Sequence, residues 1–326
     1  MLESNKEDPI WRSLFLAWRE FPQGKRPILE VDCFQYNLFT NLLGLTNDII
    51  NDNYCHGGYR KVVVAEKKRR DLAVAEIRDR VVHRLIYDEL TRIYDKTFDF
   101  DVWSCRVDKG LHRCLSRTQH LTKKYKEHFI WRMDIAKFFD NVDHKVLKNY
   151  LRRRVMDQRT LRICDEIIDS YSCSLNEKFA NARRGIPIGN LTSQVFANIY
   201  LNEFDRFVRR ALKPLAYIRY GDDTLIFART RHQANKFREI AANFLKSELK
   251  LTVNPRNDAI FRANQQIRFL GHIITEKSVV VDSRTTQAVL AKVNLRNLAS
   301  YKSLHLAKWP KRQLDFLAAD IVDDLP

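Results

Sequence analysis

Apolar and polar positions along the chain follow two patterns, one typical of strands and one typical of helices. Residues 215–220 and 224–228 are short apolar runs rich in β-branched and aromatic side chains, and Gly221-Asp222 lies at the tip between them. Such runs around a glycine-containing connection predict a β-hairpin. A two-residue connection that begins with glycine suits a type II′ turn, because glycine takes positive φ without steric cost.

The same patterns predict the other elements. Short apolar runs predict strands at residues 61–64, 130–135 and 251–253, and a strand pair or bend at 267–274. Helical spacing is expected over residues 1–60, in two helices within 145–180, and over 232–249 and 280–326. An amphipathic helix is expected to begin at Ser193. Its predicted buried side is formed by Val195, Phe196, Ile199, Tyr200 and Phe204.

Two neighbouring carboxylates lie at the tip of the predicted hairpin, and a third follows another apolar run. Asp222 and Asp223 repel each other unless a cation is present, and hard cations such as Mg²⁺ take carboxylate oxygens as ligands. Asp134 lies in the predicted strand 130–135, where a carboxylate costs free energy without a cation or donor. Together the three would form a two-metal phosphoryl-transfer site. The alternative is a solvated acidic turn.

The carboxylates that follow Asp134 have a simpler explanation. Asp140 and Asp143 stand where a helix is expected to begin, and the helix dipole favours an acidic residue at that end. The sequence therefore predicts a structural role for both.

Basic segments and a glycine-containing loop are the other candidate sites. Residues 67–70 are four consecutive cations at a predicted strand turn, where they can bind a triphosphate or a template backbone. The alternative is a solvated hairpin tip. The loop at residues 185–190 has two glycines that permit close approach of a ligand to the backbone. Residues 103–113 are basic and suggest a nucleic-acid contact.

The charge balance indicates a polyanionic partner. The 326-residue chain has 57 Lys and Arg against 40 Asp and Glu, a formal net charge of +17. Nucleic acid is favoured over a membrane, because no basic amphipathic anchor and no apolar run of roughly 18 residues is found. The amino-terminal residues are acidic and lack the apolar segment of a secretory signal, so a cytoplasmic location is expected. The length predicts two or three subdomains.

Taken in chain order, these segments resemble a reverse transcriptase. The matching features are the cations at residues 68–70, an Asp-x-x-x-x-Phe segment from Asp134 to Phe139, the loop before the amphipathic helix, Tyr-Gly-Asp-Asp at 220–223 and Phe-Leu-Gly at 269–271. The resemblance covers roughly residues 55–275. It implies an RNA-directed DNA polymerase, a nucleotidyltransferase, with the α+β right-hand fold of fingers, an antiparallel-sheet palm with helices, and a small helical thumb.

The resemblance also implies a division of the chain. Residues 1–60 would be a helical extension, and residues 61–130 and 145–192 the fingers. Residues 131–144 and 193–275 would be the palm, and 276–326 the thumb. Template RNA, the RNA/DNA hybrid and deoxynucleoside triphosphates would be the partners, with no membrane contact.

Site residues follow from the same resemblance. The catalytic carboxylates would be Asp134, Asp222 and Asp223. They would hold two Mg²⁺ ions, with Mn²⁺ as a possible substitute and the Ile135 carbonyl as a further ligand. The family places an aromatic at Phe139, where it crowds the 2′-position of the nucleotide. The nucleotide-binding residues would be Lys68, Arg69, Arg70, Phe139, Ile188, Gly189 and Gln194. The RNA-binding residues would be Arg106, Lys109 and His112.

One departure narrows the resemblance. Most reverse transcriptases carry Gln-Gly-x-x-x-Ser-Pro before the helix, whereas residues 188–194 read Ile-Gly-Asn-Leu-Thr-Ser-Gln. This form resembles the diversity-generating retroelement branch, whose enzymes copy a template RNA with frequent errors at adenine during mutagenic retrohoming. In that branch a small helical accessory variability protein assists. Residues 104–112 are also similar to it, but the branch usually has Met where this chain has Gly221.

Two other functions remain open. One is a defence-type or retron-like reverse transcriptase without a mutagenic role, although the loop at residues 185–194 does not resemble the retron branch. The other is a catalytically inactive RNA-binding scaffold. Three clustered acids at positions 134, 222 and 223 disfavour the scaffold, because a scaffold has no need for them.

Overall fold

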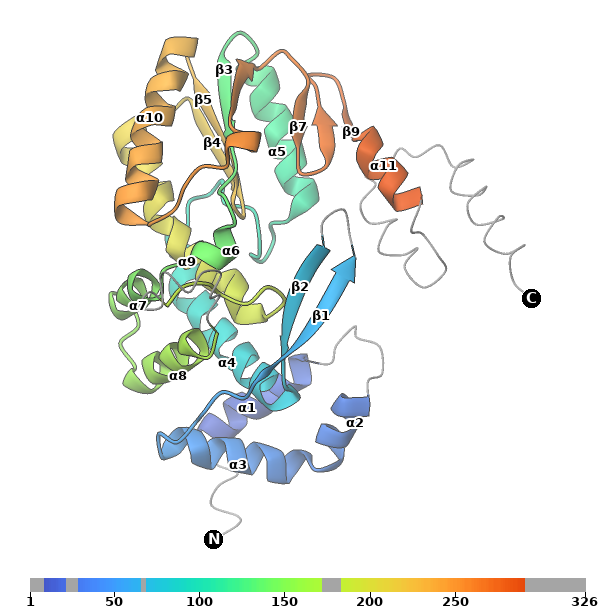
Figure 1. Cartoon of the computed structure of the whole chain (residues 1–326), viewed down its shortest axis with the longest axis vertical. Coiled ribbons are helices and arrows are strands. Elements are labelled where there is room, and N and C mark those ends of the chain that lie inside the picture. The colour runs from blue at the N-terminus through green and yellow to red at the C-terminus, as the bar shows by residue number, and fades with distance from the viewer. Residues whose placement is uncertain (1–8, 22–28, 66–68, 172–182, 291–326) are drawn as a thin grey trace, which may run out of the picture.

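The structure is a computed structural model that describes residues 9–21, 29–65, 69–171 and 183–290. In these ranges the chain forms a mixed helix and sheet fold (Figure 1). A four-stranded sheet flanked by helices lies at one end of the molecule, and a helical region with a two-stranded hairpin lies at the other.

Three helices begin the described chain, as the sequence predicted for residues 1–60. They are α1 Pro9–Glu20, α2 Leu29–Tyr36 and α3 Leu38–Ile50. Aromatic rings join them, since the centroid of Trp18 in α1 lies 5.0 Å from that of Phe34 in α2, and the centroid of Trp11 lies 6.2 Å from that of Phe39 in α3. The helical part ends before Tyr59, where the first strand begins.

The next elements form a hairpin followed by a long helix. Strand β1 Tyr59–Ala65 pairs antiparallel with β2 Arg69–Ala75, and α4 Ile77–Tyr94 follows, with η2 Asp95–Thr97 at its end. Helix α4 buries Val82, Ile86 and Leu90, spaced four residues apart, in the main core. This spacing places one face of the helix against its neighbours.

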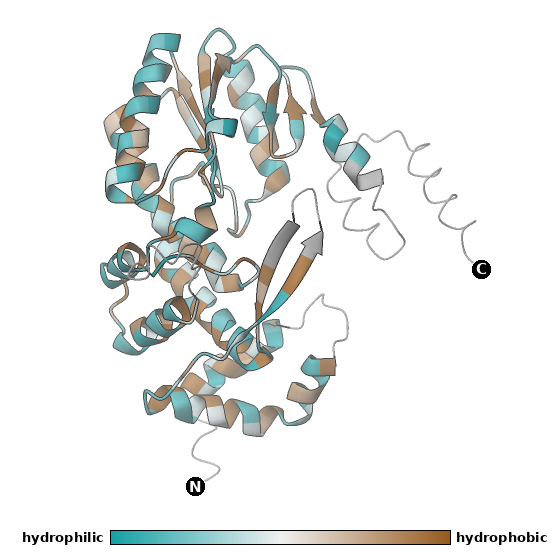
Figure 2. Cartoon of the chain, in the orientation of Figure 1, coloured by the Kyte–Doolittle hydropathy of each residue, from teal (hydrophilic) through white to brown (hydrophobic). Residues whose placement is uncertain are grey.

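The four-stranded sheet has the order β4-β5-β3-β6, and all of its pairs are antiparallel. Its strands are β3 Phe129–Met133, β4 Ala216–Tyr220, β5 Asp223–Ala228 and β6 Ala259–Arg262. Successive side chains of β5 pack into two different hydrophobic cores. Leu225 packs in a cluster with residues of α5 Leu111–Lys124, whereas Ile226 belongs to the main core with residues of α10 Arg231–Glu248. Both faces of the sheet are therefore covered (Figure 2), which explains its continuous apolar strands.

Helix α9, Leu191–Phe207, is the most deeply buried helix of the part described here, and η4 Val208–Leu212 continues it. All five apolar residues predicted for its buried side are buried. An amphipathic helix would expose its polar side to solvent, and the structure corrects that expectation. Asn198, Asn202 and Asp205 are at most 3 % exposed. Their polar atoms therefore need partners inside the protein.

The remaining elements are shorter. The helices are α6 Phe138–Asn141, α7 His144–Arg152, α8 Gln158–Asp169 and α11 Ser283–Leu290, and η5 Pro255–Asn257 is a 3₁₀ turn. A three-stranded sheet contains β7 Ile267–Phe269, β8 His272–Ile274 and β9 Val279–Val281. The predicted strand at 251–253 is wrong, because Val253 forms only a single bridge, with Ile135.

The predicted carboxyl-terminal thumb is only partly within the described residues. Strand β9 and helix α11 fall in it, and residues 291–326 lie outside the described chain. Within the described ranges, no helix is both long enough and apolar enough to cross a membrane.

Candidate active site

The β4–β5 hairpin presents the Gly-Asp-Asp segment as predicted. Tyr220 pairs with Asp223, so Gly221 and Asp222 form a two-residue turn. Gly221 has φ +63°, while Asp222 is not among the residues with positive φ. Positive φ at the first turn position alone is the signature of the type II′ turn, and it explains why glycine stands there.

Strand pairing brings Asp134 to this turn. Strand β3 runs antiparallel to β5, with Met133 opposite Thr224, and Asp134 is the next residue after β3. The register therefore places Asp134 level with the turn that carries Asp222 and Asp223. Residues about 90 positions apart in the chain meet because two central strands pair in one register.

A cavity of about 700 Å³ opens at this end of the sheet, and all three aspartates line it. Two residues predicted to bind nucleotide, Phe139 and Ile188, line the same cavity. Four further lining residues were not expected from the sequence to bind a ligand: Lys137, Asp140, Asn254 and Arg256.

The carboxyl groups of Asp222 and Asp223 both have raised pKa values. Burial, reinforced by the nearby charges of Asp134 and Asp223, raises the pKa of Asp222 to about 7. Burial also raises the pKa of Asp223, although Arg132 opposes the shift from 3.4 Å. Carboxylates held together out of water repel each other, so a positive partner would be favourable here.

Two asparagine side chains hold Asp134. The side-chain amides of Asn254 and Asn257 donate to its Oδ2 at 3.0 and 2.9 Å. Asn254 also caps η5, since its Oδ1 accepts from the backbone N–H of Arg256, which leaves its amide group for Asp134. The Asn-Pro pair at 254–255 signals only a turn, and the sequence alone could not reveal this long-range contact.

The donor set fits a hard divalent cation. Asp134 and Asp222 supply carboxylate oxygens that already crowd each other, and Asp223 follows directly. The Ile135 carbonyl stays out of the bridge to Val253, whose hydrogen bonds use the neighbouring peptides. Within the described residues, no group of three His, Cys, Asp or Glu side chains is already arranged around a metal position. The carboxylate of Asp223 pairs with Arg132 at 3.4 Å, so a cation would compete with Arg132 for it.

Both acids that follow Asp134 lie at helix starts, as the sequence predicted. Asp143 caps α7, and its Oδ1 accepts from the backbone N–H of Val146 at 3.1 Å. Asp140 lies in the first turn of α6, as expected, but it also lines the cavity.

Two other residues predicted to bind nucleotide do not line the aspartate cavity. Gly189 and Gln194 line a second cavity of about 350 Å³, beside Arg80 and Arg84. The backbone carbonyl of Ile188 accepts from the N–H of Ala73 in β2 at 3.2 Å. The loop that contains Ile188 is thereby attached to the β1–β2 hairpin, which carries the basic run.

The basic run itself is only partly described. Lys68 lies outside the described residues, and Arg69 and Arg70 are described only as the first positions of β2. They pair with Ala65 and Val64 near the tip of the hairpin. Their role in binding a triphosphate stays a prediction.

One residue of the predicted RNA-binding group has a structural role instead. The side chain of Arg106 is 10 % exposed, and it donates to Asp95 at 2.7 Å and to the carbonyl of Asp99 at 2.8 Å. It is therefore committed within the protein, which argues against a direct contact with RNA. Lys109 lies 3.8 Å from the ring centre of Phe100, and His112 lies on α5. For Lys109 and His112, RNA binding stays a prediction.

Comparison with known proteins identifies relatives over most of the chain. The family described as "Reverse transcriptase (RNA-dependent DNA polymerase)" matches residues 59–274. Protein YkfC of Escherichia coli (strain K12) is 25 % identical over 315 residues, covering 85 % of this chain and 82 % of YkfC. The group II intron-encoded protein LtrA of Lactococcus lactis subsp. cremoris is 22 % identical, covering 66 % of this chain but only 46 % of LtrA.

Solved structures of similar fold include telomerases. A Candida albicans telomerase in complex with a TWJ fragment of telomeric RNA aligns with a TM-score of 0.51 and 14 % identity, covering 76 % of this chain and 49 % of that one. Apo telomerase of Candida tropicalis aligns at 0.50 with 12 % identity, covering 70 % and 49 %. At such identities the alignments show a shared fold, and this chain spans about half of each telomerase chain.

The donor set generates a prediction about cation binding. Asp222→Asn removes one anionic oxygen donor and leaves the turn glycine in place. We expect Mn²⁺ affinity, measured by electron paramagnetic resonance, to fall by about tenfold or more, since even indirect ligand contacts are worth roughly 10–100-fold. The matched control is Asp88→Asn, an exposed acid on α4. Equal loss of affinity in both variants would contradict the site.

Proposed function

Because the chain belongs to the reverse transcriptase family, as its match over residues 59–274 shows, we propose that it is an RNA-directed DNA polymerase that makes cDNA from a template RNA. The observation that carries the proposal is the convergence of Asp134, Asp222 and Asp223 on one cavity. In a family described as RNA-dependent DNA polymerases, this convergence supports a catalytic centre rather than an inactive RNA-binding scaffold.

The carboxylates would hold two divalent cations, Mg²⁺ or Mn²⁺, together with the Ile135 carbonyl. When bound, such ions lower the pKa of an attacking hydroxyl and neutralise charge on the transferred phosphate. The chain's own contribution is to fix the ligands. Asn254 and Asn257 hold Asp134, and the β3–β5 register keeps it at the turn. The primer 3′-hydroxyl would then attack the α-phosphate in line, and pyrophosphate would leave.

The shape of the cavity supports a role in choosing the sugar. Both phenylalanines line the cavity, but Phe138 is a core residue, at 2 % exposed, whereas Phe139 is half-buried. The ring of Phe139 packs edge-on against Phe138 at 5.3 Å, so the core backs it. We propose that Phe139 crowds the 2′-position of the incoming nucleotide, as the family resemblance implies.

The basic character of the chain supports nucleic acid as its partner. A formal net charge of +17 attracts polyanions such as template RNA and the RNA/DNA hybrid. In the same way Arg69 and Arg70, beside Lys68, are proposed to contact the triphosphate. A rise in the nucleotide KM of Arg70→Ala without loss of RNA affinity would support that assignment.

The finer proposal concerns the branch. The Ile-Gly-x-x-x-Ser-Gln form of residues 188–194 supports a diversity-generating retroelement enzyme, with error-prone copying at template adenines. Ile188 lines the aspartate cavity and offers no side-chain hydrogen bond to the nucleotide. Base pairing and shape alone would then select the incoming nucleotide. The same branch adds a small helical accessory variability protein as a proposed partner, which co-purification with this chain would test.

Primer extension tests the proposed activity. We expect the chain to extend a DNA primer on an RNA template with deoxynucleoside triphosphates and Mg²⁺ or Mn²⁺. Asp134→Asn should lower the rate by about 100-fold or more, because charge stabilisation by metal ions is worth several kcal/mol. Asp88→Asn should keep the wild-type rate and RNA affinity. Extension by Asp134→Asn at the wild-type rate would remove the catalytic assignment.

Phe139 gives a second test. Phe139→Ala opens space beside the sugar, so we expect the ratio of ribonucleotide to deoxyribonucleotide incorporation to rise by about tenfold or more, since a steric pocket discriminates by roughly 10–200-fold. Phe139→Tyr retains the bulk and should keep the wild-type ratio. Single-nucleotide extension kinetics measure both. An active Phe139→Ala enzyme with an unchanged ratio would exclude the role.

Ile188 gives a test of the branch. We expect more misincorporation opposite template adenine than opposite the other three bases, as the resemblance to the branch implies. The two hydrogen bonds of an A·T pair, against three in G·C, make template A and T alike more dependent on positioning, so hydrogen-bond count alone would not separate A from T. Ile188→Gln should narrow the difference without abolishing synthesis, whereas Ile188→Leu should keep it. Sequencing cDNA copied from a defined RNA measures the errors. Equal error rates at all four bases would leave an ordinary reverse transcriptase.

A further inference from the structure

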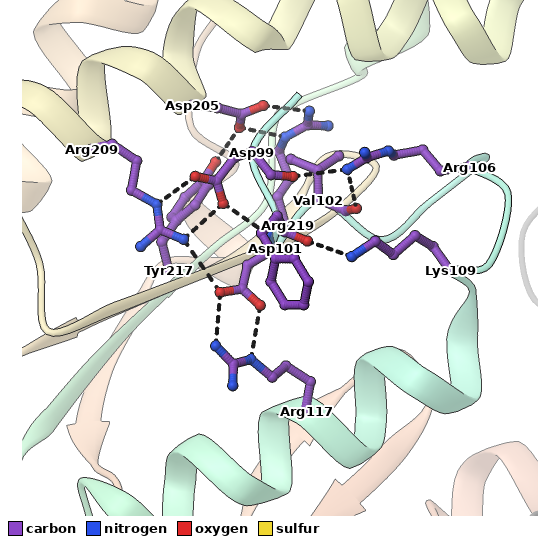
Figure 3. A network of polar contacts seen from close by, with 11 residues as sticks. Asp99, Asp101, Val102, Arg106, Lys109, Arg117, Asp205, Arg209, Tyr217 and Arg219 are labelled. Atoms are coloured by element: carbon purple, nitrogen blue, oxygen red, sulfur yellow. Dashed lines mark hydrogen bonds and ion pairs between the residues drawn. The ribbon is translucent and has the colours of Figure 1, made fainter. Parts of the chain in front are cut away.

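A buried ion pair lies directly behind the Gly-Asp-Asp turn. Arg219, in β4, donates from Nε and Nη2 to the two carboxylate oxygens of Asp205 in α9, each at 2.7 Å, and both side chains are 1 % exposed (Figure 3). Tyr217 donates its hydroxyl to the same carboxylate at 2.5 Å. Burial, followed by the charge of Asp205, raises the pKa of Tyr217 well above its usual value, so the hydroxyl remains a donor.

The third nitrogen of Arg219 reaches the turn itself. Its Nη1 donates to the backbone carbonyl of Gly221 at 3.0 Å and to Oδ1 of Asn198 at 3.1 Å. The carbonyl of Gly221 belongs to the peptide that leads into Asp222. Through this contact a buried guanidinium that does not line the cavity holds the turn.

The amide side of the same glycine is held as well. The backbone N–H of Gly221 donates to Ser104 Oγ at 2.9 Å. The side-chain amide of Asn198 donates to the Ser104 carbonyl at 2.9 Å. Asn198 therefore joins the two contacts, and Ser104, Asn198, Arg219 and Gly221 form one closed ring of hydrogen bonds.

The segment that contains Ser104 is itself anchored. Arg209 binds both carboxylate oxygens of Asp99 at 2.7 Å, and Arg117 donates to Asp101 at 2.9 Å (Figure 3). The backbone of Asp101 also accepts from the N–H of Arg219 at 2.9 Å. Ser104 thus approaches the turn from a loop that ion pairs attach to both η4 and α5.

Stability alone does not explain such a network. Replacing a buried ion pair by apolar residues is often neutral or stabilising, so a buried pair is weak support for a purely stabilising role. The contacts here converge on one residue, Gly221, and hold both its N–H and its C=O. A displacement of about 1 Å at a catalytic group can cost roughly 100-fold in rate, so a turn that carries such groups benefits from fixed partners.

We propose that Ser104, Asn198 and Arg219 are positioning residues that hold the Gly221 backbone and thereby place Asp222 opposite Asp134. The proposal rests on the proposed function, since it assigns these residues to the polymerase carboxylates. None of the three lines the cavity, so they act through the turn and do not touch substrate.

Cation affinity and catalysis test the proposal together. Ser104→Ala removes the acceptor of the Gly221 N–H, and Asn198→Leu removes the link between the two contacts at similar volume. We expect each to lower Mn²⁺ affinity, read by electron paramagnetic resonance, roughly 3- to 10-fold, the value of one hydrogen bond. In primer extension, kcat should fall by about tenfold with KM for template–primer unchanged.

Two variants serve as controls. Ser104→Thr retains the hydroxyl and should restore both Mn²⁺ affinity and kcat. Thr122→Val removes an equally buried hydroxyl, one that donates to the Thr118 carbonyl within α5 and does not contact the turn. It should leave both quantities at the wild-type level. Circular dichroism and thermal unfolding check that each variant is folded.

Each outcome decides one claim. Wild-type Mn²⁺ affinity in folded Ser104→Ala and Asn198→Leu would overturn the positioning role, and so would an equal loss in Thr122→Val. If the wild-type chain binds Mn²⁺ at a site that Asp222→Asn removes, yet never extends a primer, the polymerase proposal fails. The Mn²⁺ affinities of the variants then still decide whether the ring positions the turn.

Discussion

The repulsion between Asp134 and Asp222 is the constraint on which the rest of the site depends. Asp134 directly follows β3 and Asp222 lies in the β4–β5 turn, and the β3–β5 register brings them together at one end of the sheet. An isolated pair of this kind would separate or take up a proton. The protein resists separation with neutral amide donors on Asp134 and a held backbone under Asp222. The resulting concentration of negative charge is what a divalent cation would relieve.

The two-sided burial of the sheet makes this arrangement rigid. Side chains of β5 alternate between the core under α5 and the core under α9 and α10, so a one-residue slip would exchange both sets. The register that buries Leu225 on one face and Ile226 on the other is the register that sets Asp134 at the turn. Packing of the apolar residues therefore determines the geometry of the charged ones.

The sequence predicted the hairpin with two carboxylates at its tip, the carboxylate of Asp134 at the end of a strand, and most helices, because their signals are local. Gly221 at the turn and the period of α9 are read directly from neighbouring residues. The polar partners could not be found in this way. Asn198 and Asp205 lie on a helix that reads as apolar on one side, and their partners lie in β4 and the 99–106 segment. Arg106 shows the reverse error, since a basic residue in a basic stretch is used inside the fold. Only long-range pairing decides such cases.

The 185–190 loop is attached to the fold in a way that does not depend on the side chain at position 188. The loop is tied to β2 through Ala73, whose N–H binds the Ile188 carbonyl and whose carbonyl accepts from Asn190 at 2.8 Å. The contact at position 188 uses the backbone alone. Gly189, at φ +111°, provides the left-handed conformation between the two contacts. Since neither contact depends on the side chain at 188, a substitution there would change what faces the cavity while the loop keeps its place.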